Sequence, residues 1–364
     1  MQELLNKINQ FISNNQKFAT ATVTNTWGSA PRPIGSMMLI GEDGTMSGSV
    51  SGGCVEGAVV RLAGEVLREN TPKLVNFGVS DNEAWAVGLS CGGSIEVFIE
   101  PFLAFSEPKM WDILRGCLED NKGAILLTKL NDGVNEHQLI LANGAIINSE
   151  LINAKSINLN KNELINANKN ELINANFLIN SALETYQQRK TKKIETANND
   201  KWFAQVFPPK NQLIIIGAAH ITVDLVHLAH YFGFETTVID PRGIFSYKTD
   251  FSTPPHNLYV DWPAEVLPEM TLDAYTYVVL LTHDPKIDDQ ALHLLMRSNV
   301  AYIGALGSKK THEKRLKRLA EAGFTEGECA KINAPVGVNI NAKSAREIAV
   351  SIIGALIKAK NEYL

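Results

Sequence analysis

Cysteine is scarce in this sequence, and its spacing is not that of a disulfide framework or a zinc finger. The cysteines are Cys54, Cys91, Cys117 and Cys329, and no two of them form a CxxC pair. Because disulfides persist mainly in oxidising compartments, this spacing favours a reducing cytosol. We therefore expect a cytoplasmic protein whose cysteines remain thiols.

Long apolar segments, an excess of positive charge and some catalytic motifs are also missing. No apolar run reaches the roughly 18 residues that a membrane-spanning helix needs, so no membrane partner is expected. The 364 residues carry a formal net charge of −5, which argues against nucleic acid as a partner. Neither HExxH nor a Walker A motif occurs, which argues against zinc protease and P-loop sites.

Residues 1–148 predict an α+β domain. Runs that alternate in polarity or are rich in β-branched residues, bounded by Gly, Pro and Asn turns, indicate strands. They are expected at 19–26, 36–40, 94–100, 124–130 and 137–141. Helices are expected at the N-terminus, after Cys54 and at 109–120. With 45% hydrophobic residues, the chain is long enough to hold a second domain.

Residues 149–207 predict an insertion followed by a linker. The eight residues KNELINAN at 161–168 recur at 169–176, and a degenerate copy begins at Glu150. Such a period could indicate a solenoid, but the copies are too few to bury a core. We therefore expect an Asn-rich surface insertion without chemistry, then a helix at about 177–189 and a polar stretch.

Residues 208–364 alternate between apolar strands and helices. The expected strands are 213–216, 236–239, 277–281 and 301–303, and the expected helices are 221–232, 309–322 and 345–360. Consecutive strand–helix units indicate a doubly wound parallel sheet, as in Rossmann-like domains. The predicted fold class is thus α/β, with an N-terminal α+β domain and a C-terminal Rossmann-like domain.

Two cysteines beside glycine pairs are the most informative motifs. Cys54 ends the sequence SGGC at 51–54, and Cys91 lies in SCGG at 90–93. Paired glycines allow successive N–H groups to form an anion-binding concavity. A thiolate beside such a concavity can act as a nucleophile or a soft metal ligand. The alternative is that both cysteines are small buried hydrophobic residues.

The second domain carries a degraded dinucleotide fingerprint. Gly217 follows a strand and opens a helix, and Asp240 lies where an acidic residue would bind a ribose hydroxyl. The second glycine of the fingerprint is replaced by Ala219, whose methyl would face the pyrophosphate. We expect NAD(P) to bind weakly or not at all, and Ala219→Gly to strengthen binding by about 1 kcal/mol.

Other polar clusters have less specific interpretations. His283 and Asp284 follow a strand at the carboxyl edge of the sheet, where doubly wound folds bind ligands. His220 begins a helix face that also holds Asp224 and His227, a spacing compatible with a metal site or with a polar helix edge. The basic helix that begins at Lys309 is expected to be mainly a solvated face, although its start could hold a phosphate.

Longer motifs resemble the XdhC and CoxI proteins. The matching segments are GSAPRPIG (28–35), GSVSGGCVEG (48–57), SCGGSIEVFIEP (90–101), IIIGAAHI (214–221), VIDPR (238–242), LTHDPKIDDQAL (281–292), YIGALGSKKTHEKR (302–315) and INAPVGVNINAKSAREIAVSI (332–352). Where the family usually has Gly-Ala-Gly-His, this chain has Ala219 in the third position. The Asn-rich repeat is not a recognised family feature.

The resemblance implies a maturation factor rather than an enzyme. Members bind newly made molybdenum cofactor of the molybdopterin type and protect it while a cysteine desulfurase supplies its sulfido ligand. They then deliver it to an apo molybdenum hydroxylase of the xanthine dehydrogenase type. A homodimer is one expected assembly. Two alternatives remain open: an NAD(P)-dependent oxidoreductase and a nucleotide-sensing regulatory module.

The candidate site combines the motif residues of both domains. The expected metal ligands are Cys54 and Cys91. The expected cofactor-binding residues are Arg32, Gly52, Gly53, Cys54, Glu56, Cys91, Gly92, Gly93, Gly217, His220, Asp240, His283 and Asp284.

Overall fold

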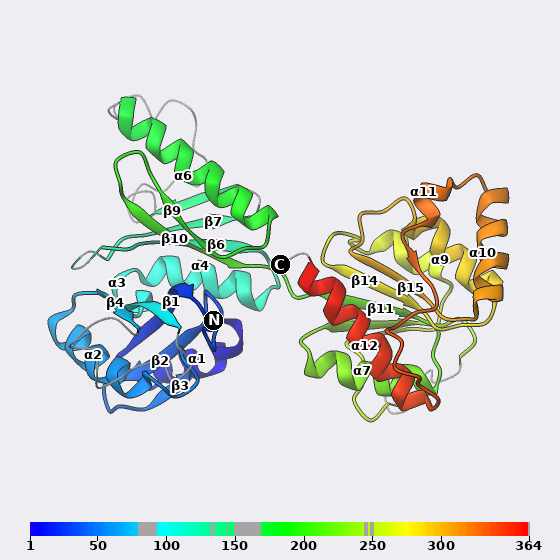
Figure 1. Cartoon of the computed structure of the whole chain (residues 1–364), viewed down its shortest axis with the longest axis horizontal. Coiled ribbons are helices and arrows are strands. Elements are labelled where there is room, and N and C mark those ends of the chain that lie inside the picture. Colours follow the sequence, from blue (N-terminus) through cyan, green and yellow to red (C-terminus); the bar gives the residue numbers. More distant parts are fainter. Residues whose placement is uncertain are drawn as a thin grey trace. The chain divides into compact units, whose positions relative to one another are not determined.

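The chain forms two compact units, Met1–Pro209 and Lys210–Leu364, in a computed structural model (Figure 1). The structure describes residues 1–78, 93–131, 133, 135–142, 144–148, 169–243, 247 and 251–362. No helix in these ranges is long and apolar enough to cross a membrane.

The first unit begins with an antiparallel sheet in the order β3-β2-β1-β5-β4. Its strands are β1 (Phe18–Trp27), β2 (Met37–Gly41), β3 (Met46–Gly48), β4 (Lys73–Phe77) and β5 (Ser94–Pro101). Helix α2 (Glu56–Glu69) covers one face, because its apolar stripe of Val59, Ala63 and Val66 packs on the sheet. The opposite face packs against α1 (Leu5–Ser13) and α4 (Pro108–Glu119). The short η1 (Gln2–Leu4) and α3 (Leu103–Ser106) precede these two helices.

A second antiparallel sheet completes the first unit, in the order β8-β7-β6-β10-β9. Its strands are β6 (Ala124–Lys129), β7 (His137–Leu141), β8 (Ile146–Asn148), β9 (Lys192–Glu195) and β10 (Lys201–Phe207). Helix α6 (Lys169–Gln187) lies along one face (Figure 1). Its residues Leu178 and Ala182 are buried there with Ile125 and Trp202.

This sheet corrects the expectation that residues 149–207 are only an insertion and a linker. Residues 192–207 hold the strands β9 and β10 of the first unit, and β10 pairs with β6 from Trp202 to Phe207. The polar composition of β9 concealed it, because an edge strand needs few buried residues and here buries only Ile194. Helix α6 begins at Lys169 rather than near 177, so the second repeat copy is helical. The first copy lies outside the described residues.

A buried ion cluster joins the two sheets of the first unit. The His137 ring on β7 contacts Glu100 of β5 through Nε2 (2.9 Å) and Glu107 through Nδ1 (3.1 Å). Burial opposes the charged ring, but the two carboxylates outweigh it and raise the pKa of His137 to about 10. His137 is therefore an imidazolium at neutral pH, and both of its N–H groups are used.

The second unit is a parallel sheet in the order β13-β12-β11-β14-β15-β16. This order and its helix layers confirm the predicted doubly wound, Rossmann-like fold. Its strands are β11 (Gln212–Ile216), β12 (Glu235–Ile239), β13 (Asn257–Tyr259), β14 (Thr276–Leu280), β15 (Tyr302–Ala305) and β16 (Ile332–Asn333). The central strands are continuous apolar runs because both faces of the sheet are covered.

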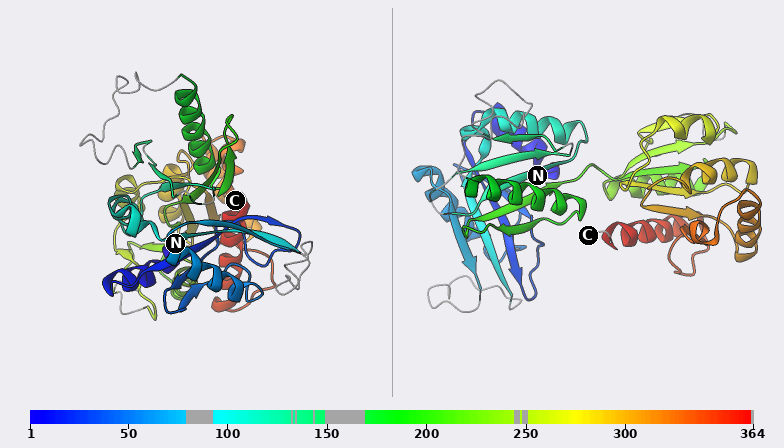
Figure 2. Two further views of the ribbon diagram at one scale, coloured as in Figure 1. Left: turned by 90° about the vertical axis from the view of Figure 1, so that its left-hand side faces the viewer. Right: turned by 90° about the horizontal axis from the view of Figure 1, so that it is seen from above.

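Helices form a layer on each face of this sheet. One layer holds α7 (His220–Tyr231) and α12 (Ala345–Glu362), which pack together over Leu213 and Ile215. Helix α12, drawn in red, lies in front of the sheet in Figure 1 and below it in the right-hand view of Figure 2. The other layer packs over Ile214 and Ile216. It holds α8 (Pro263–Val266), η5 (Leu267–Glu269), α9 (Pro285–Leu295), α10 (Lys309–Glu321) and α11 (Glu326–Cys329).

Candidate functional site

Three motif segments of the first unit meet at one end of its first sheet. Strand β1 ends at Trp27, which pairs with Ser94 at the start of β5. Gly93 lies so close to the segment after Trp27 that a Cβ there would be 2.8 Å from the Ser29 carbonyl oxygen, so only glycine fits. From the other side, a Cβ on Gly52 would be 3.8 Å from the Pro31 Cβ. The segment 28–35 thus contacts Gly93 and lies close to Gly52 of the SGGC loop.

The SGGC loop is wrapped around the carboxylate of Glu56, the first residue of α2. Oε1 accepts hydrogen bonds from the Ser49 hydroxyl (2.7 Å) and the Ser51 N–H (2.9 Å), and Oε2 accepts one from the Gly53 N–H (2.8 Å). The Gly52 N–H donates to the Ser49 hydroxyl (2.8 Å). Gly52 and Gly53 have φ values of 78° and 119°, which favour glycine.

The anion in this backbone concavity is therefore the protein's own. Glu56 is 8% exposed. Burial opposes its ionisation, but the hydrogen bonds from Ser49 and Ser51 prevail and lower its pKa to about 2. The sequence correctly indicates a concavity of N–H groups, but in the structure those of Gly52 and Gly53 already have acceptors. Glu56 shapes the loop rather than leaving its N–H groups for a ligand.

Cys54 follows the glycine pair and precedes Val55, the N-cap residue of α2. It is partly buried beside the apolar core under α2 and is not in a disulfide. A thiol in this position can serve as a soft metal ligand. Cys91 and Gly92 lie outside the described residues.

Strand β10 and the residue before β9 support the segment 28–35. The Gln205 side-chain amide donates to the Gly35 carbonyl (3.2 Å). Thr191 also lies against Gly35, where a Cβ would be 3.3 Å from its methyl group. Residues expected to be a linker therefore hold one end of a motif segment in place.

Two exposed side chains flank the same segment. Arg32 is exposed, as a residue that meets an anion would be. Trp27 is 72% exposed and presents a large aromatic surface. Trp27 was not among the residues predicted from the sequence, although its place directly before Gly28 was a usable signal.

In the second unit, the fingerprint loop also binds an internal carboxylate. Asp240 is 2% exposed and accepts from the Ala218 N–H (2.6 Å). It also accepts from Arg242 Nε (2.9 Å) and Nη2 (2.7 Å). Burial works against the charged form, but these bonds lower the pKa of Asp240. Asp240, the residue expected to bind a ribose hydroxyl, thus already accepts hydrogen bonds from Ala218 and Arg242 of its own chain.

The other fingerprint residues have structural contacts. The Gly217 N–H donates to the Ile239 carbonyl (2.9 Å), and the Ala219 N–H donates to the Thr222 hydroxyl (3.1 Å). His220 is exposed at the start of α7. Among the described residues, no group of three or more His, Cys, Asp and Glu side chains could hold a metal ion. His227 instead contacts the Thr253 hydroxyl (2.6 Å), and Asp224 lies 3.7 Å from Arg346, as on a polar helix edge.

His283 and Asp284 lie just before and at the N-cap of α9 and have other roles than Asp240. Asp284 is the N-cap of α9, and its carboxylate accepts from the Lys286 N–H (2.9 Å). His283 is exposed and lines a cavity of about 370 Å³ at the ends of β14 and β15. Asp240 is not among the residues that line this cavity.

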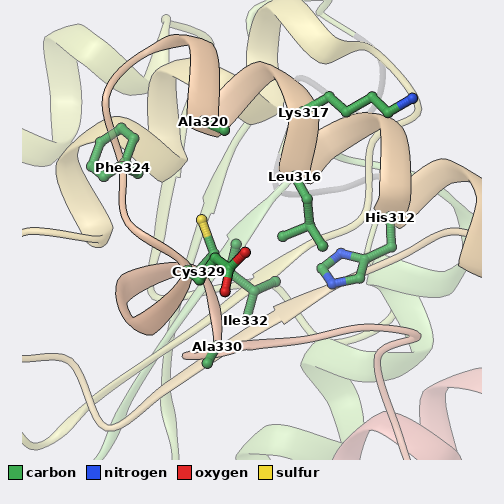
Figure 3. A pocket seen from close by; sticks show the side chains of 9 residues that line it. His312, Leu316, Lys317, Ala320, Phe324, Cys329, Ala330 and Ile332 are labelled. Atoms are coloured by element: carbon green, nitrogen blue, oxygen red, sulfur yellow. The ribbon is translucent and has the colours of Figure 1, made fainter.

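A further cavity of about 480 Å³ lies between α10 and α11 (Figure 3). It is lined mainly by apolar groups, including Leu316, Phe324 and Ile332, with the His312 ring at one side. Cys329 also lines it, and burial raises the pKa of its thiol. Cys117 is buried in α4, and burial raises its thiol pKa as well. Neither thiol has the glycine-rich surroundings of Cys54.

Comparison with known families agrees with the motifs. Residues 213–356 match the family model of the XdhC Rossmann domain, and residues 11–78 match that of the XdhC and CoxI family. The chain belongs to the XdhC and CoxI family. The resemblance stated from the sequence is confirmed.

Two named relatives and one solved structure align with this chain over most of their own length. A protein of Bacillus subtilis, named as a probable subunit of xanthine dehydrogenase, is 26% identical, covering 97% of this chain and 96% of that protein. The molybdenum cofactor insertion chaperone PaoD of Escherichia coli is 25% identical, covering 93% and 82%. A crystal structure from Bacillus halodurans, described as a xanthine dehydrogenase, has a TM-score of 0.72 and 26% identity, covering 98% and 96%.

Proposed function

We propose that this protein is a maturation factor that binds molybdenum cofactor as cargo and transfers it to a molybdenum hydroxylase of the xanthine dehydrogenase type. The observation that carries the proposal is the convergence of the SGGC loop, the segment 28–35 and Gly93 at one end of the first sheet. Membership of the XdhC and CoxI family and the name of the PaoD relative support the same role.

The residues at this end of the sheet suit a sulfur-rich molybdenum group. Cys54 supplies a soft ligand beside a rigid loop, and Cys91 is the proposed second ligand. Trp27 offers an exposed aromatic face for a planar pterin, and Arg32 offers a charge for an anionic group. The cargo would supply the molybdenum and its dithiolene, while this chain binds, orients and shields it.

In this proposal the backbone N–H groups of the SGGC loop hold the loop in shape and do not bind the cargo. Because Gly53 already donates to Glu56, the phosphate of the cargo is not expected to bind in the SGGC loop. Glu56 instead fixes the loop that presents Cys54. Gly52, Gly53 and Gly93 are then positioning residues, since each permits a backbone path that a side chain would strain or block.

The rest of the proposal concerns the partners of the protein, its location in the cell and its assembly. A cysteine desulfurase that supplies the sulfido ligand, a cytoplasmic location and a homodimer remain predictions. One relative is named as part of the dehydrogenase and another as a chaperone. A chaperone releases the hydroxylase after loading, whereas a permanent component of the enzyme stays bound. Size-exclusion chromatography of the protein with loaded and unloaded hydroxylase distinguishes these two cases.

The test is cofactor retention by the full chain after expression in cells that make molybdenum cofactor. Molybdenum is measured by mass spectrometry, and the pterin by fluorescence of its oxidised form. We expect Cys54→Ser to retain less than about one fifth of the wild-type amount, because serine removes the soft ligand. Cys117→Ser is the matched control and should retain it all. Full retention of both molybdenum and pterin by Cys54→Ser would refute the proposal.

A further inference from the structure

The cavity of about 370 Å³ in the second unit lies where two helices begin. Helix α9 starts at Pro285, just beyond the end of β14, and α10 starts at Lys309, just beyond the end of β15. The Ser308 hydroxyl caps the Thr311 N–H (3.2 Å). The first N–H groups of a helix have no acceptor within the helix, so this end of α10 is electropositive.

Arg315 lines the cavity. Its burial is not expected of a helix whose basic residues form only a solvated face. It is 2% exposed. Its Nη2 donates to the Asp288 carboxylate (3.2 Å) and to the Leu306 carbonyl (3.0 Å). Its Nε and Nη1 are buried and have no hydrogen-bond partner in the part of the chain that the structure describes. Buried guanidinium nitrogens without acceptors are costly, so an oxygen-rich ligand that reached them would satisfy donors that the chain leaves unpaired.

The charge around the cavity is that of an anion site. It is lined by the cationic side chains Lys310, Lys314, Arg315 and Arg318 and by one carboxylate, Asp288. Arg318 is held by Asp289 (2.6 Å) and Arg315 by Asp288. Within the described ranges, Lys310 and Lys314 have no ion-pair partner. Two unpaired ammonium groups match a dianion better than a carboxylate.

Hydroxyl groups complete the lining. Ser308 and Thr311 lie at the start of α10, and Thr282 lies at the end of β14. A tetrahedral group with several acceptor oxygens can use hydroxyl, backbone N–H, ammonium and guanidinium donors together. This site differs from the fingerprint loop at Gly217, whose Ala218 N–H is taken by Asp240.

We propose that this cavity binds the phosphoryl group of a small phosphorylated ligand. The group lies at the start of α10 beside Arg315, with Lys310 and Lys314 balancing its charge. The ligand could be a nucleotide or a phosphomonoester without a base. The proposal concerns the second unit alone and does not depend on cofactor retention at Cys54.

Calorimetric titration of the full chain with inorganic phosphate and pyrophosphate tests the site. We expect saturable binding that weakens at least about tenfold in the double variant Lys310→Gln, Lys314→Gln, because charge-assisted hydrogen bonds are lost. Lys317→Gln is the matched control, since it removes a lysine of α10 that does not line this cavity. It should change the affinity less than about twofold, as expected for a residue outside the site.

Arg315 is tested together with its acidic partner. The variant Arg315→Met, Asp288→Asn removes both buried charges, so neither is left without its partner. We expect it to unfold cooperatively and to lose phosphate binding, whereas Asp288→Asn alone should still bind. If the Arg315 variant does not fold, the lysine variants decide the matter.

Cytidine monophosphate and glycerol 3-phosphate distinguish the two ligand sources. Tighter binding of the first indicates a nucleotide, and equal binding indicates recognition of the phosphoryl group alone. The proposal is overturned if no phosphate probe saturates the protein. It is equally overturned if Lys317→Gln weakens binding as much as the lysine pair does, because binding would then reflect diffuse charge.

Discussion

Each unit of this protein buries a cationic side chain, and the two cations differ in how completely they are partnered. His137 in the first unit uses both ring nitrogens, one toward Glu100 and one toward Glu107. Arg315 in the second unit uses only Nη2, while Nε and Nη1 lack partners within the described residues. A buried charge with complete partners holds structure together. The unpartnered nitrogens of Arg315 belong to the phosphate site proposed above.

The same distinction applies to the glycine-rich loops. The Gly53 N–H meets Glu56, and the Ala218 N–H meets Asp240, so each loop contains a carboxylate from its own chain. Sequence alone cannot tell an internal anion from a bound one, because both use the same N–H groups. The variants His137→Leu and Glu56→Gln test whether these partnered groups are structural.

His137→Leu is expected to have the largest effect on stability. It leaves Glu100 and Glu107 as buried carboxylates without their cation and should cost roughly 3–5 kcal/mol of unfolding free energy. Chemical denaturation measures the loss. Adding Glu100→Gln should recover part of it, since one buried charge is then removed. A His137→Leu protein as stable as wild type would contradict the structural role of this cluster.

The pKa of His137 also predicts how stability depends on pH. The folded value of about 10 exceeds the ordinary value of 6.5. The contribution of His137 to stability is therefore fully present below pH 6.5 and is lost as the pH rises through 10. His137→Leu should lack this alkaline loss.

Glu56→Gln is expected to destabilise the first unit by roughly 2–3 kcal/mol, because the amide cannot accept all the hydrogen bonds that converge on the carboxylate. Its folded pKa of about 2 lies below the ordinary value of 4.5. The stabilisation is thus present above pH 4.5 and is lost as the pH falls toward 2. Glu69→Gln, on the last turn of α2, is the control. Equal denaturation midpoints for the two variants would show that Glu56 does not shape the loop.

Ala219→Gly sharpens the comparison at the fingerprint loop. Removing the methyl alone leaves Asp240 on the Ala218 N–H, so the gain in dinucleotide affinity should fall short of the ~1 kcal/mol expected from the fingerprint. Calorimetry with NADH and NADPH measures it. Micromolar binding by the unmodified protein would instead favour the oxidoreductase alternative.

Deleting residues 150–168 should have the smallest effect, within about 0.5 kcal/mol, since surface insertions cost little to remove. A longer deletion to residue 182 removes Leu178 and Ala182 from the core under α6 and should destabilise the first unit. Thermal unfolding compares the two. Loss of cooperativity in the shorter deletion would show that the repeat packs as structure.

Much of the fold followed from sequence patterns, since apolar periodicity and turn residues mark buried strands and helices. The expected strands at 94–100 and 213–216 lie within a residue or so of β5 and β11. Strands β9 and β10 were missed, because an edge strand such as β9 needs few apolar residues and β10 follows a polar segment. The motif loops were located correctly, but the partners of their N–H groups were not. These contacts depend on rotamers of Glu56 and Asp240 that no spacing rule specifies.

Protection of Cys54 by the cofactor tests the central claim most directly. Cargo-loaded and cargo-free protein are treated with iodoacetamide, and alkylation of each cysteine is followed by mass spectrometry. We predict that Cys54 is alkylated in the cargo-free protein and protected in the loaded one, while Cys117 stays unmodified in both because it is buried. Equal alkylation rates of Cys54 with and without stoichiometric cofactor would contradict the account.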